Sequence, residues 1–284
     1  MSIRNVFVIG LGTMGLDIAQ VFASHGMFVH AYECNEQFLE RAKARLHANL
    51  AKRVERSKMS QEEMDYILGN FSWEVDDYTK FADADLVLEA VAENLNIKRD
   101  IYKRVEEFCP ERTIIATNTS SLSITELGAK LDRPIIGMHF FNPATVMKLV
   151  EVIRGMDTSD ETFETITKLS RKLEKEPVEV SEGPGFVVNR ILIPMINEAC
   201  CLVQEGIASP ADIDTAMKLG ANHPMGPLAL GDLIGLDVCL AIMDTMYSET
   251  NDPKFRACTL LRKMVRAKKL GKKTGIGFYD YTAK

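Results

Sequence analysis

Short apolar runs alternate with longer amphipathic segments as far as about residue 183. The runs have the length of buried strands, and the segments between them repeat their apolar residues at helical spacing. Strands are therefore expected close to residues 6–10, 28–33, 85–91, 113–118 and 135–141. This alternation predicts a mainly parallel sheet with helices on both faces, which is an α/β fold.

Polar residues at the starts of the amphipathic segments predict where several helices begin. Asn35 can cap a long helix, and Ser60 with Glu63 has the spacing of a capping box. Ser123 with Glu126 suggests a second capping box. These signals give the first domain helices after its second and fourth predicted strands.

Another helix is expected to start at Asn94. Beyond this cap, Ile97, Ile101, Val105 and Phe108 recur at helical spacing, which indicates an amphipathic helix.

The pattern changes at residues 182–185, where the sequence reads Glu-Gly-Pro-Gly, and helix signals then follow one another without a convincing strand. We therefore expect two domains, an α/β domain at residues 1–183 and an all-α domain at residues 184–284. The segment 186–206 is apolar nearly all round and must be buried, which a second copy of the chain in a dimer would achieve.

Charge and composition exclude several classes of protein. The formal net charge of −6 argues against a nucleic-acid partner, although it leaves room for a local basic pocket. No signal peptide or membrane-spanning stretch is visible, so we expect a cytoplasmic protein with no membrane partner. The six cysteines and five histidines lack the spacing of metal ligands, and neither a metal nor disulfides are expected.

A glycine-rich loop follows the first apolar run. It reads Gly10-Leu11-Gly12-Thr13-Met14-Gly15 and leads directly into a helical pattern. In this context Gly10 makes a tight turn, Gly12 admits a pyrophosphate against the backbone, and Gly15 lets helix and strand pack closely. The free N–H groups at the helix start favour the anion. The spacing predicts a Rossmann-type dinucleotide site.

Glu33 ends the second strand, about twenty residues beyond the loop. A carboxylate at this place accepts hydrogen bonds from the ribose hydroxyls and repels a 2′-phosphate. We therefore expect the chain to prefer NAD to NADP. The alternative is a glutamate that merely ends a strand.

The run from His139 to Glu151 joins two short strands through the turn dipeptide Asn142-Pro143. If the strands pair antiparallel about Ala144-Thr145, His139 and Glu151 lie opposite each other. A carboxylate beside an imidazole fixes its tautomer and stabilises the imidazolium, as a general base requires. The alternative is a core histidine beside an ordinary strand carboxylate.

Motifs spread over nearly the whole chain resemble one family, the L-3-hydroxyacyl-CoA dehydrogenases, and among them the bacterial 3-hydroxybutyryl-CoA dehydrogenases. The resemblance is carried by GLGTMG (10–15), LEAVAENL (88–95), ATNTSSLSI (116–124), GMHFFNP (137–143), MKLVEVI (147–153), GPGFVVNR (183–190), DTAMKLGANHPMGPL (214–228) and GKKTGIGFYDY (271–281). It implies a Rossmann domain that binds NAD, and a helical domain that dimerises and closes over an acyl-CoA substrate.

The resemblance also implies roles for particular residues. It makes His139 the general base, Glu151 its partner, and Ser120 and Asn189 the other active-site polar residues. The stretch around Ser120 could otherwise be only a strand-to-helix turn with local hydrogen bonds.

Family positions near the nicotinamide half of the cofactor are matched by Glu93, Lys98 and Asn142. Without the resemblance, Lys98 would read as an exposed helix lysine and Asn142 as a turn former.

For coenzyme A the family uses the long helix after the second strand. The candidates there are Asn49, Lys52 and Arg56, where the chain departs most from the family pattern. Basic residues at this spacing share one helix face and can bind phosphates, yet they are also common as solvated charges.

The resemblance thus implies oxidation of an L-3-hydroxyacyl-CoA to the 3-ketoacyl-CoA, with 3-hydroxybutyryl-CoA as the expected substrate. Two alternatives remain at this point. One is a dehydrogenase of a hydroxy or sugar acid without coenzyme A, and the other is a dinucleotide-binding protein without catalysis.

Overall fold

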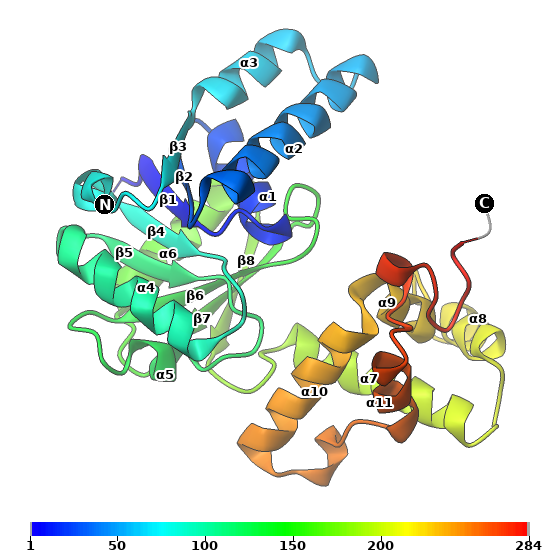
Figure 1. Cartoon of the computed structure of the whole chain (residues 1–284). Coiled ribbons are helices and arrows are strands. Elements are labelled where there is room, and N and C mark those ends of the chain that lie inside the picture. Colours follow the sequence, from blue (N-terminus) through cyan, green and yellow to red (C-terminus); the bar gives the residue numbers. More distant parts are fainter. Residues whose placement is uncertain (1, 283–284) are drawn as a thin grey trace. The chain divides into compact units, whose positions relative to one another are not determined.

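The protein is described by a computed structural model, in which residues 2–282 are placed. The chain divides into two compact units, residues 1–182 and 183–284 (Figure 1). Each unit has its own hydrophobic core.

The first unit is built on one eight-stranded sheet, with strand order β3-β2-β1-β4-β5-β6-β7-β8. Neighbouring strands run parallel except β6 and β7, which pair antiparallel. The strands are β1 (Asn5–Ile9), β2 (Phe28–Glu33), β3 (Phe71–Val75), β4 (Leu86–Glu89), β5 (Ile114–Thr117), β6 (Ile135–Phe140), β7 (Leu149–Arg154) and β8 (Glu176–Ser181). The chain order is reversed beside β1, where β4 adds to the other side, and this is the place where α/β sheets bind ligands.

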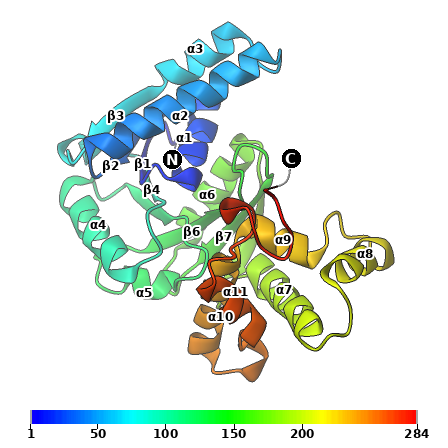
Figure 2. The same ribbon diagram turned by 45° about the vertical axis from the view of Figure 1, so that its right-hand side comes forward.

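Helices cover both faces of the sheet, with α1, α2 and α3 on one side and α4 and α5 on the other (Figure 1 and Figure 2). They are α1 (Thr13–Ser24), α2 (Glu36–Glu55), α3 (Gln61–Gly69), α4 (Leu95–Phe108), α5 (Ile124–Gly128) and α6 (Asp160–Lys172), with a short 3₁₀ turn η1 (Thr79–Asp83). The predicted α/β fold class is confirmed.

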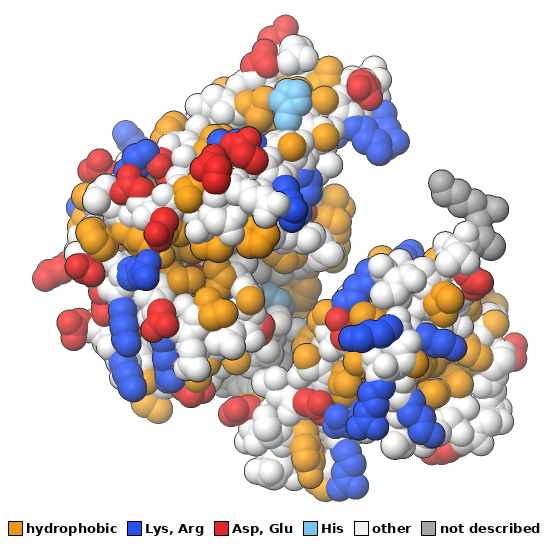
Figure 3. Space-filling model, viewed as in Figure 1, with side chains coloured by type: hydrophobic (Ala, Val, Ile, Leu, Met, Phe, Trp, Pro, Cys, Tyr) orange, Lys and Arg blue, Asp and Glu red, His pale blue; other side chains and the backbone are white. Residues whose placement is uncertain are grey.

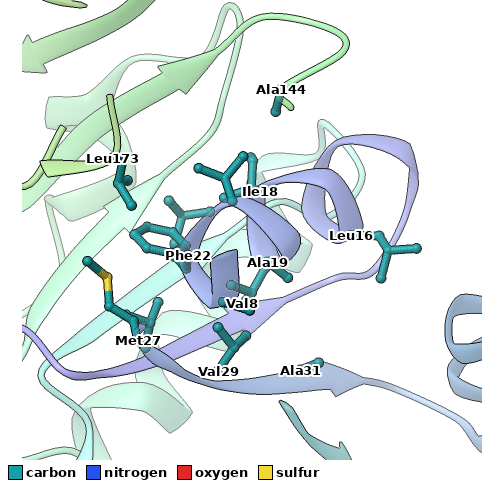
Figure 4. Close-up of a cluster of buried hydrophobic side chains, with 14 of the residues drawn as sticks. Val8, Leu16, Ile18, Ala19, Phe22, Met27, Val29, Ala31, Ala144 and Leu173 are labelled. Atoms are coloured by element: carbon teal, nitrogen blue, oxygen red, sulfur yellow. The ribbon is translucent and has the colours of Figure 1, made fainter. Parts of the chain in front are cut away.

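The core of this unit forms where α1 lies on the sheet. Phe22 and Ile18 of α1 are fully buried, as are Val8 of β1 and Val29 of β2 (Figure 4). Their packing fixes the height of α1 over β1, and so fixes the loop that joins them.

The predicted helix starts are mostly confirmed. The Asn35 side chain accepts a hydrogen bond from Phe38 N–H, and Ser60 with Glu63 forms a reciprocal capping box. Ser123 also caps its helix by accepting from Glu126 N–H, without the reciprocal bond of a box.

Helix α4 begins after Asn94 as predicted, but its apolar residues do not all face the core. Ile97 is 46% exposed, whereas the polar residues Lys98 and Tyr102 are buried together with Val105. The buried face of α4 thus combines Val105 of the apolar stripe with Lys98 and Tyr102, whose polar groups have partners inside the protein.

The second unit is helical. Its helices are α7 (Val188–Gln204), α8 (Pro210–Gly220), α9 (Pro227–Ile234), α10 (Leu236–Thr250) and α11 (Thr259–Arg266), with 3₁₀ turns η2 (Pro253–Phe255) and η3 (Lys272–Thr274). Helix α7 packs against α9, α10 and α11 through a core that includes Ile196, Leu228 and Leu261. Gly235, with φ of 104°, ends α9 and starts α10 within one long apolar segment.

Acidic and basic side chains are interspersed over the visible surface of the first unit (Figure 3). Within residues 2–282, no helix combines the length and the apolar character needed to cross a bilayer.

Candidate active site

The glycine loop between β1 and α1 leaves no room for larger residues at two of its positions. Gly10 has φ of +89°, a conformation that other residues rarely adopt. A Cβ atom on Gly15 would lie 1.8 Å from the carbonyl oxygen of Gly10. A Cβ atom on Gly12 would meet nothing within 4 Å, so the backbone there is open to a ligand.

Helix α1 presents its N-terminus to the same opening. Gly12 is its N-cap, no side chain caps it, and Thr13, Met14 and Gly15 form its first turn. Unpaired N–H groups at a helix start bind anions well. The guanidinium of Arg45, from α2, donates to the carbonyl groups of the loop at Leu11 (2.9 Å) and Gly12 (2.7 Å).

Glu33 is tied to this loop. One carboxylate oxygen accepts from Leu11 N–H at 2.7 Å, and the other accepts from Cys34 N–H at 3.2 Å. Glu33, Gly10 and Gly12 line a cavity of about 550 Å³ whose apolar wall includes Ile97 and Ile101.

In Figure 3, hydrophobic side chains are exposed between the regions of α2 and α4. An acid, a glycine loop, a helix N-terminus and an apolar wall fit the ribose, pyrophosphate and adenine of NAD. The position of Ile97 and Ile101 in this wall explains why these residues do not enter the core.

His139 and Glu151 face each other across the β6–β7 hairpin. They are register partners, as predicted, and His139 Nδ1 lies 2.8 Å from Glu151 Oε2. The two residues are 6% and 1% exposed. The ring of Phe141 lies beside the imidazole, with 4.6 Å between the ring centroids.

This contact assigns the tautomer of the neutral imidazole. An ionised carboxylate only accepts hydrogen bonds, so the proton of the neutral ring is on Nδ1 and the lone pair is on Nε2. The pair can therefore take up a proton at Nε2, and the resulting positive charge lies beside Glu151.

Two ionisable side chains, Lys175 and Asp17, form hydrogen bonds to the backbone of the loop between β6 and β7. The buried Lys175 donates to the carbonyl oxygens of Ala144 (2.6 Å) and Met147 (2.8 Å), and burial lowers its pKa. Burial raises the pKa of Asp17, although Arg45 and a hydrogen bond from Ala144 N–H act in the opposite direction. Asn142, exposed in this loop, stands before a cis proline peptide bond.

Ser120 lies in the loop after β5. Next to it, Asn118 Oδ1 accepts from Phe140 N–H at 2.8 Å, which ties this loop to the end of β6, where His139 lies. Glu93 accepts from Ser120 N–H at 2.8 Å and from the Thr119 hydroxyl at 2.6 Å.

Lys98 is 1% exposed and contacts two carboxylates. Its ammonium group lies 2.9 Å from Glu89 and 3.1 Å from Glu93. The Tyr102 hydroxyl donates to Glu89 at 2.6 Å, and burial together with this carboxylate raises the pKa of Tyr102. Glu89 explains why α4 turns Lys98 and Tyr102 inward.

The other predicted residues belong to the region of α2 and to α7. Asn49, Lys52 and Arg56 are exposed, within or directly after α2, at a spacing that places them on one helix face. Asn189 lies in the first turn of α7, in the second unit.

Sequence reasoning missed Arg45, Glu89 and Lys175. Glu89 carried a usable signal, because it ends an apolar strand in the same way as Glu33. Arg45 and Lys175 carried none, since a basic residue in a helix or a turn is normally solvated.

Comparison with known proteins shows the family of the chain. Residues 5–183 match the model for the NAD binding domain of 3-hydroxyacyl-CoA dehydrogenase, and residues 185–281 match the model for its C-terminal domain. The chain belongs to the 3-hydroxyacyl-CoA dehydrogenase family. It is an NAD-dependent oxidoreductase of that family.

Individual relatives are similar over the full length. A 3-hydroxybutyryl-CoA dehydrogenase of Clostridioides difficile is 55% identical, with 96% of this chain and 98% of the relative covered. A probable 3-hydroxybutyryl-CoA dehydrogenase of Bacillus subtilis is 50% identical over 100% of this chain and 99% of its own.

A solved structure of (S)-3-hydroxybutyryl-CoA dehydrogenase from Ralstonia eutropha has a TM-score of 0.94. It is 46% identical and covers 99% of this chain and 100% of its own. The family resemblance stated from the motifs is confirmed, and a dinucleotide-binding protein without catalysis is not supported.

Proposed function

We propose that the protein interconverts L-3-hydroxybutyryl-CoA and acetoacetyl-CoA, with His139 as the general base. The main support for this role of His139 is the 2.8 Å contact between His139 Nδ1 and Glu151 Oε2, two buried residues of the β6–β7 hairpin. The C4 substrate is supported by the names of the relatives from Clostridioides difficile and Ralstonia eutropha.

In the forward direction His139 Nε2 takes the proton of the C3 hydroxyl group. The carboxylate of Glu151 stabilises the imidazolium that this transfer forms. NAD, when bound, accepts the hydride from C3. In the reverse direction the imidazolium returns the proton to the nascent alkoxide.

The other assignments follow from the family positions. Ser120 and Asn189 contact the substrate oxygen or help to place the histidine. Glu93, Lys98 and Asn142 serve the nicotinamide half of the cofactor site, with Lys98 acting through its two carboxylates because its ammonium group is buried between them. The glycine loop from Gly10 to Gly15 and Glu33 serve the pyrophosphate and the ribose.

Coenzyme A recognition is assigned to Asn49, Lys52 and Arg56, which share one exposed face of α2. Lys52→Ala is expected to raise KM for acetoacetyl-CoA about threefold to tenfold, because one charge contact to a phosphate is lost. The KM for acetoacetyl-pantetheine, which lacks the nucleotide phosphates, should not change. An equal rise for both thioesters would contradict the assignment.

We further propose that the protein is a homodimer or a higher homo-oligomer in the cytoplasm. Ile191 of α7 is 70% exposed in the single chain, and an apolar helix of this kind is commonly covered by a second copy. Light scattering on the purified protein would measure the mass of the assembly, and the mass of a single chain would contradict the proposal.

The base is tested by His139→Gln. The amide retains much of the volume of the ring but cannot accept the proton, so kcat should fall about a hundredfold to ten-thousandfold. The dissociation constant for NADH, measured by fluorescence, should stay close to that of the wild type. Near-normal turnover by His139→Gln would end the proposal.

The substrate class is tested by steady-state rates on 3-ketoacyl-CoA thioesters from C4 to C16 and on free acetoacetate. The highest kcat/KM is expected for acetoacetyl-CoA. A preference for acetoacetate would favour the alternative, a dehydrogenase of an acid without coenzyme A, and a preference for long chains would move the substrate within the family.

A further inference from the structure

Glu89 is a buried carboxylate at the carboxyl end of β4, and it is fully inaccessible to solvent. A buried charge is costly unless other groups pair with it and donate hydrogen bonds. Here the ammonium group of Lys98 lies 2.9 and 3.0 Å from the two oxygens. The hydroxyls of Tyr102 (2.6 Å) and Thr117 (2.9 Å) and the N–H of Val91 (2.7 Å) also donate to this carboxylate.

Lys98 connects Glu89 with a second carboxylate, that of Glu93. An ammonium group has three donors, and the ammonium of Lys98 lies within hydrogen-bond distance of two oxygens of Glu89 and, at 3.1 Å, of Glu93 Oε2. The position of one oxygen of Glu93 is therefore set from inside the protein by the Glu89–Lys98 pair.

The other oxygen of Glu93 holds the loop after β5. Glu93 Oε1 accepts from the Thr119 hydroxyl (2.6 Å) and from the N–H groups of Ser120 (2.8 Å) and Ser121 (3.2 Å). Successive donors of one loop thus converge on a single carboxylate oxygen.

A second route joins Glu89 to the same loop through Thr117, the last residue of β5. The Thr117 hydroxyl donates to Glu89 and accepts from Thr119 N–H at 3.2 Å. Glu89 therefore reaches the loop of Ser120 from two directions, across α4 and along β5.

The same carboxylate stands beside the cofactor loop. Glu89 is the register partner of Ile9, the last residue of β1, and a Cβ atom on Gly10 would touch Val91, which follows Glu89 by two residues. Its network thus joins the strand ends from which both the cofactor loop and the Ser120 loop start.

We propose that Glu89 is a positioning residue, whose buried charge fixes Lys98 and Glu93 and thereby the backbone of the Ser120 loop. The proposal rests on the proposed function only where it takes Ser120 to act on the substrate. Glutamine at position 89 would keep the size of the side chain. It would offer one acceptor oxygen in place of two and set an amide NH₂ against the donors that now surround the carboxylate.

Hydrogen exchange of the backbone tests this without any turnover. In Glu89→Gln, amides in a peptide covering residues 118–122 should exchange about tenfold faster by mass spectrometry, because the loop opens more often. Thr117→Val removes only the hydroxyl that links Glu89 to Thr119 N–H. It should therefore accelerate exchange in the same peptide by a smaller factor. Unchanged exchange in this peptide in both variants would overturn the proposal.

The chain offers a matched control at the other end of β5. Thr113 is buried and donates through its hydroxyl to the Ala84 carbonyl oxygen at 2.6 Å. Thr113→Val removes a hydroxyl of the same kind, so exchange at residues 118–122 should stay as in the wild type. If Glu89→Gln does not fold, the comparison of Thr117→Val with Thr113→Val decides, and equal exchange in these two variants would contradict the proposal.

Kinetics separate positioning from stability. Glu89→Gln should lower kcat about tenfold, as expected for a misplaced contact group, while the NADH dissociation constant changes less than the turnover. Combined with Ser120→Ala it should lower kcat no further than Ser120→Ala alone, because both changes act on one contact. Losses that multiply would contradict the proposal.

Failure of the proposed function can be distinguished from failure of the proposal for Glu89. If Ser120→Ala keeps the wild-type kcat, the assigned role of Ser120 is wrong. The exchange measurement still tests whether Glu89 holds the loop.

Discussion

At Glu93, burial and charge act in opposite directions on one carboxyl group. Burial favours the protonated form, but Lys98, the Thr119 hydroxyl and Ser120 N–H stabilise the ionised form more, and the pKa of Glu93 lies below its ordinary value of 4.5. A carboxyl group with a lowered pKa in the folded state stabilises the fold above its unfolded pKa. This contribution is lost as the pH falls through the folded value.

This sign gives a prediction for Glu93→Gln. The variant should melt at a lower temperature than the wild type at pH 7. The gap should shrink once the pH falls below about 4.5, because the Glu93 carboxyl group of the unfolded chain then takes up a proton before that of the folded protein does. Thermal unfolding between pH 3.5 and 8 measures it, with Glu111→Gln as a control at an exposed position. A gap that is as wide at pH 3.5 as at pH 7 would contradict this account of Glu93.

At the level of single residues, the helix caps could be predicted from the sequence, but the burial of Lys98 could not. Asn35, Ser60 and Asn94 cap helices through neighbours in the sequence, so local spacing was enough to predict them. The burial of Lys98 depends on Glu89, which lies in another element, and no local pattern contains that pairing.

Among the elements, the loop between β1 and α1 contains one glycine that the stability of the fold requires and another that cofactor binding requires. A Cβ atom on Gly15 would lie 1.8 Å from a backbone oxygen of Gly10, so Gly15→Ala should destabilise the fold by about 1–3 kcal/mol. Gly12 has φ of −60° and free space around it, so Gly12→Ala should change stability by less than about 0.5 kcal/mol. Gly12→Ala should still weaken NADH binding, because the pyrophosphate approaches the backbone there.

Urea unfolding and NADH titration on the two variants check this pair of expectations. The account of the loop would be wrong if Gly12→Ala bound NADH as tightly as the wild type. It would also be wrong if Gly15→Ala kept the wild-type stability.

The hairpin of β6 and β7 could be predicted because its turn and its two apolar runs are adjacent in the sequence. The register partners His139 and Glu151 followed from counting outward from Ala144-Thr145. Strand β3 (Phe71–Val75) was not predicted, since its burial arises from β2 and α2, and its own pattern is short.

For the whole molecule, the division at residue 182 predicts that NADH binding can be separated from turnover. Residues 1–182 contain the complete sheet, a core of their own and every residue assigned to NAD. Expressed alone, this fragment should unfold cooperatively and bind NADH within about tenfold of the full-length affinity. It should not reduce acetoacetyl-CoA, because Asn189 belongs to the other unit.

Circular dichroism and NADH fluorescence on the fragment are the measurements. A fragment that lacks a cooperative transition, or that fails to bind NADH, would show that the second unit is needed for more than turnover.

One consequence of the β6–β7 hairpin concerns the engineering of related enzymes. The proposed base and its supporting acid lie on one uninterrupted stretch of chain, residues 139–151, and they meet through main-chain pairing between its two arms. This stretch can therefore be exchanged between relatives as a cassette. We expect such chimaeras to keep their proton-transfer chemistry while their choice of acyl group stays with the recipient.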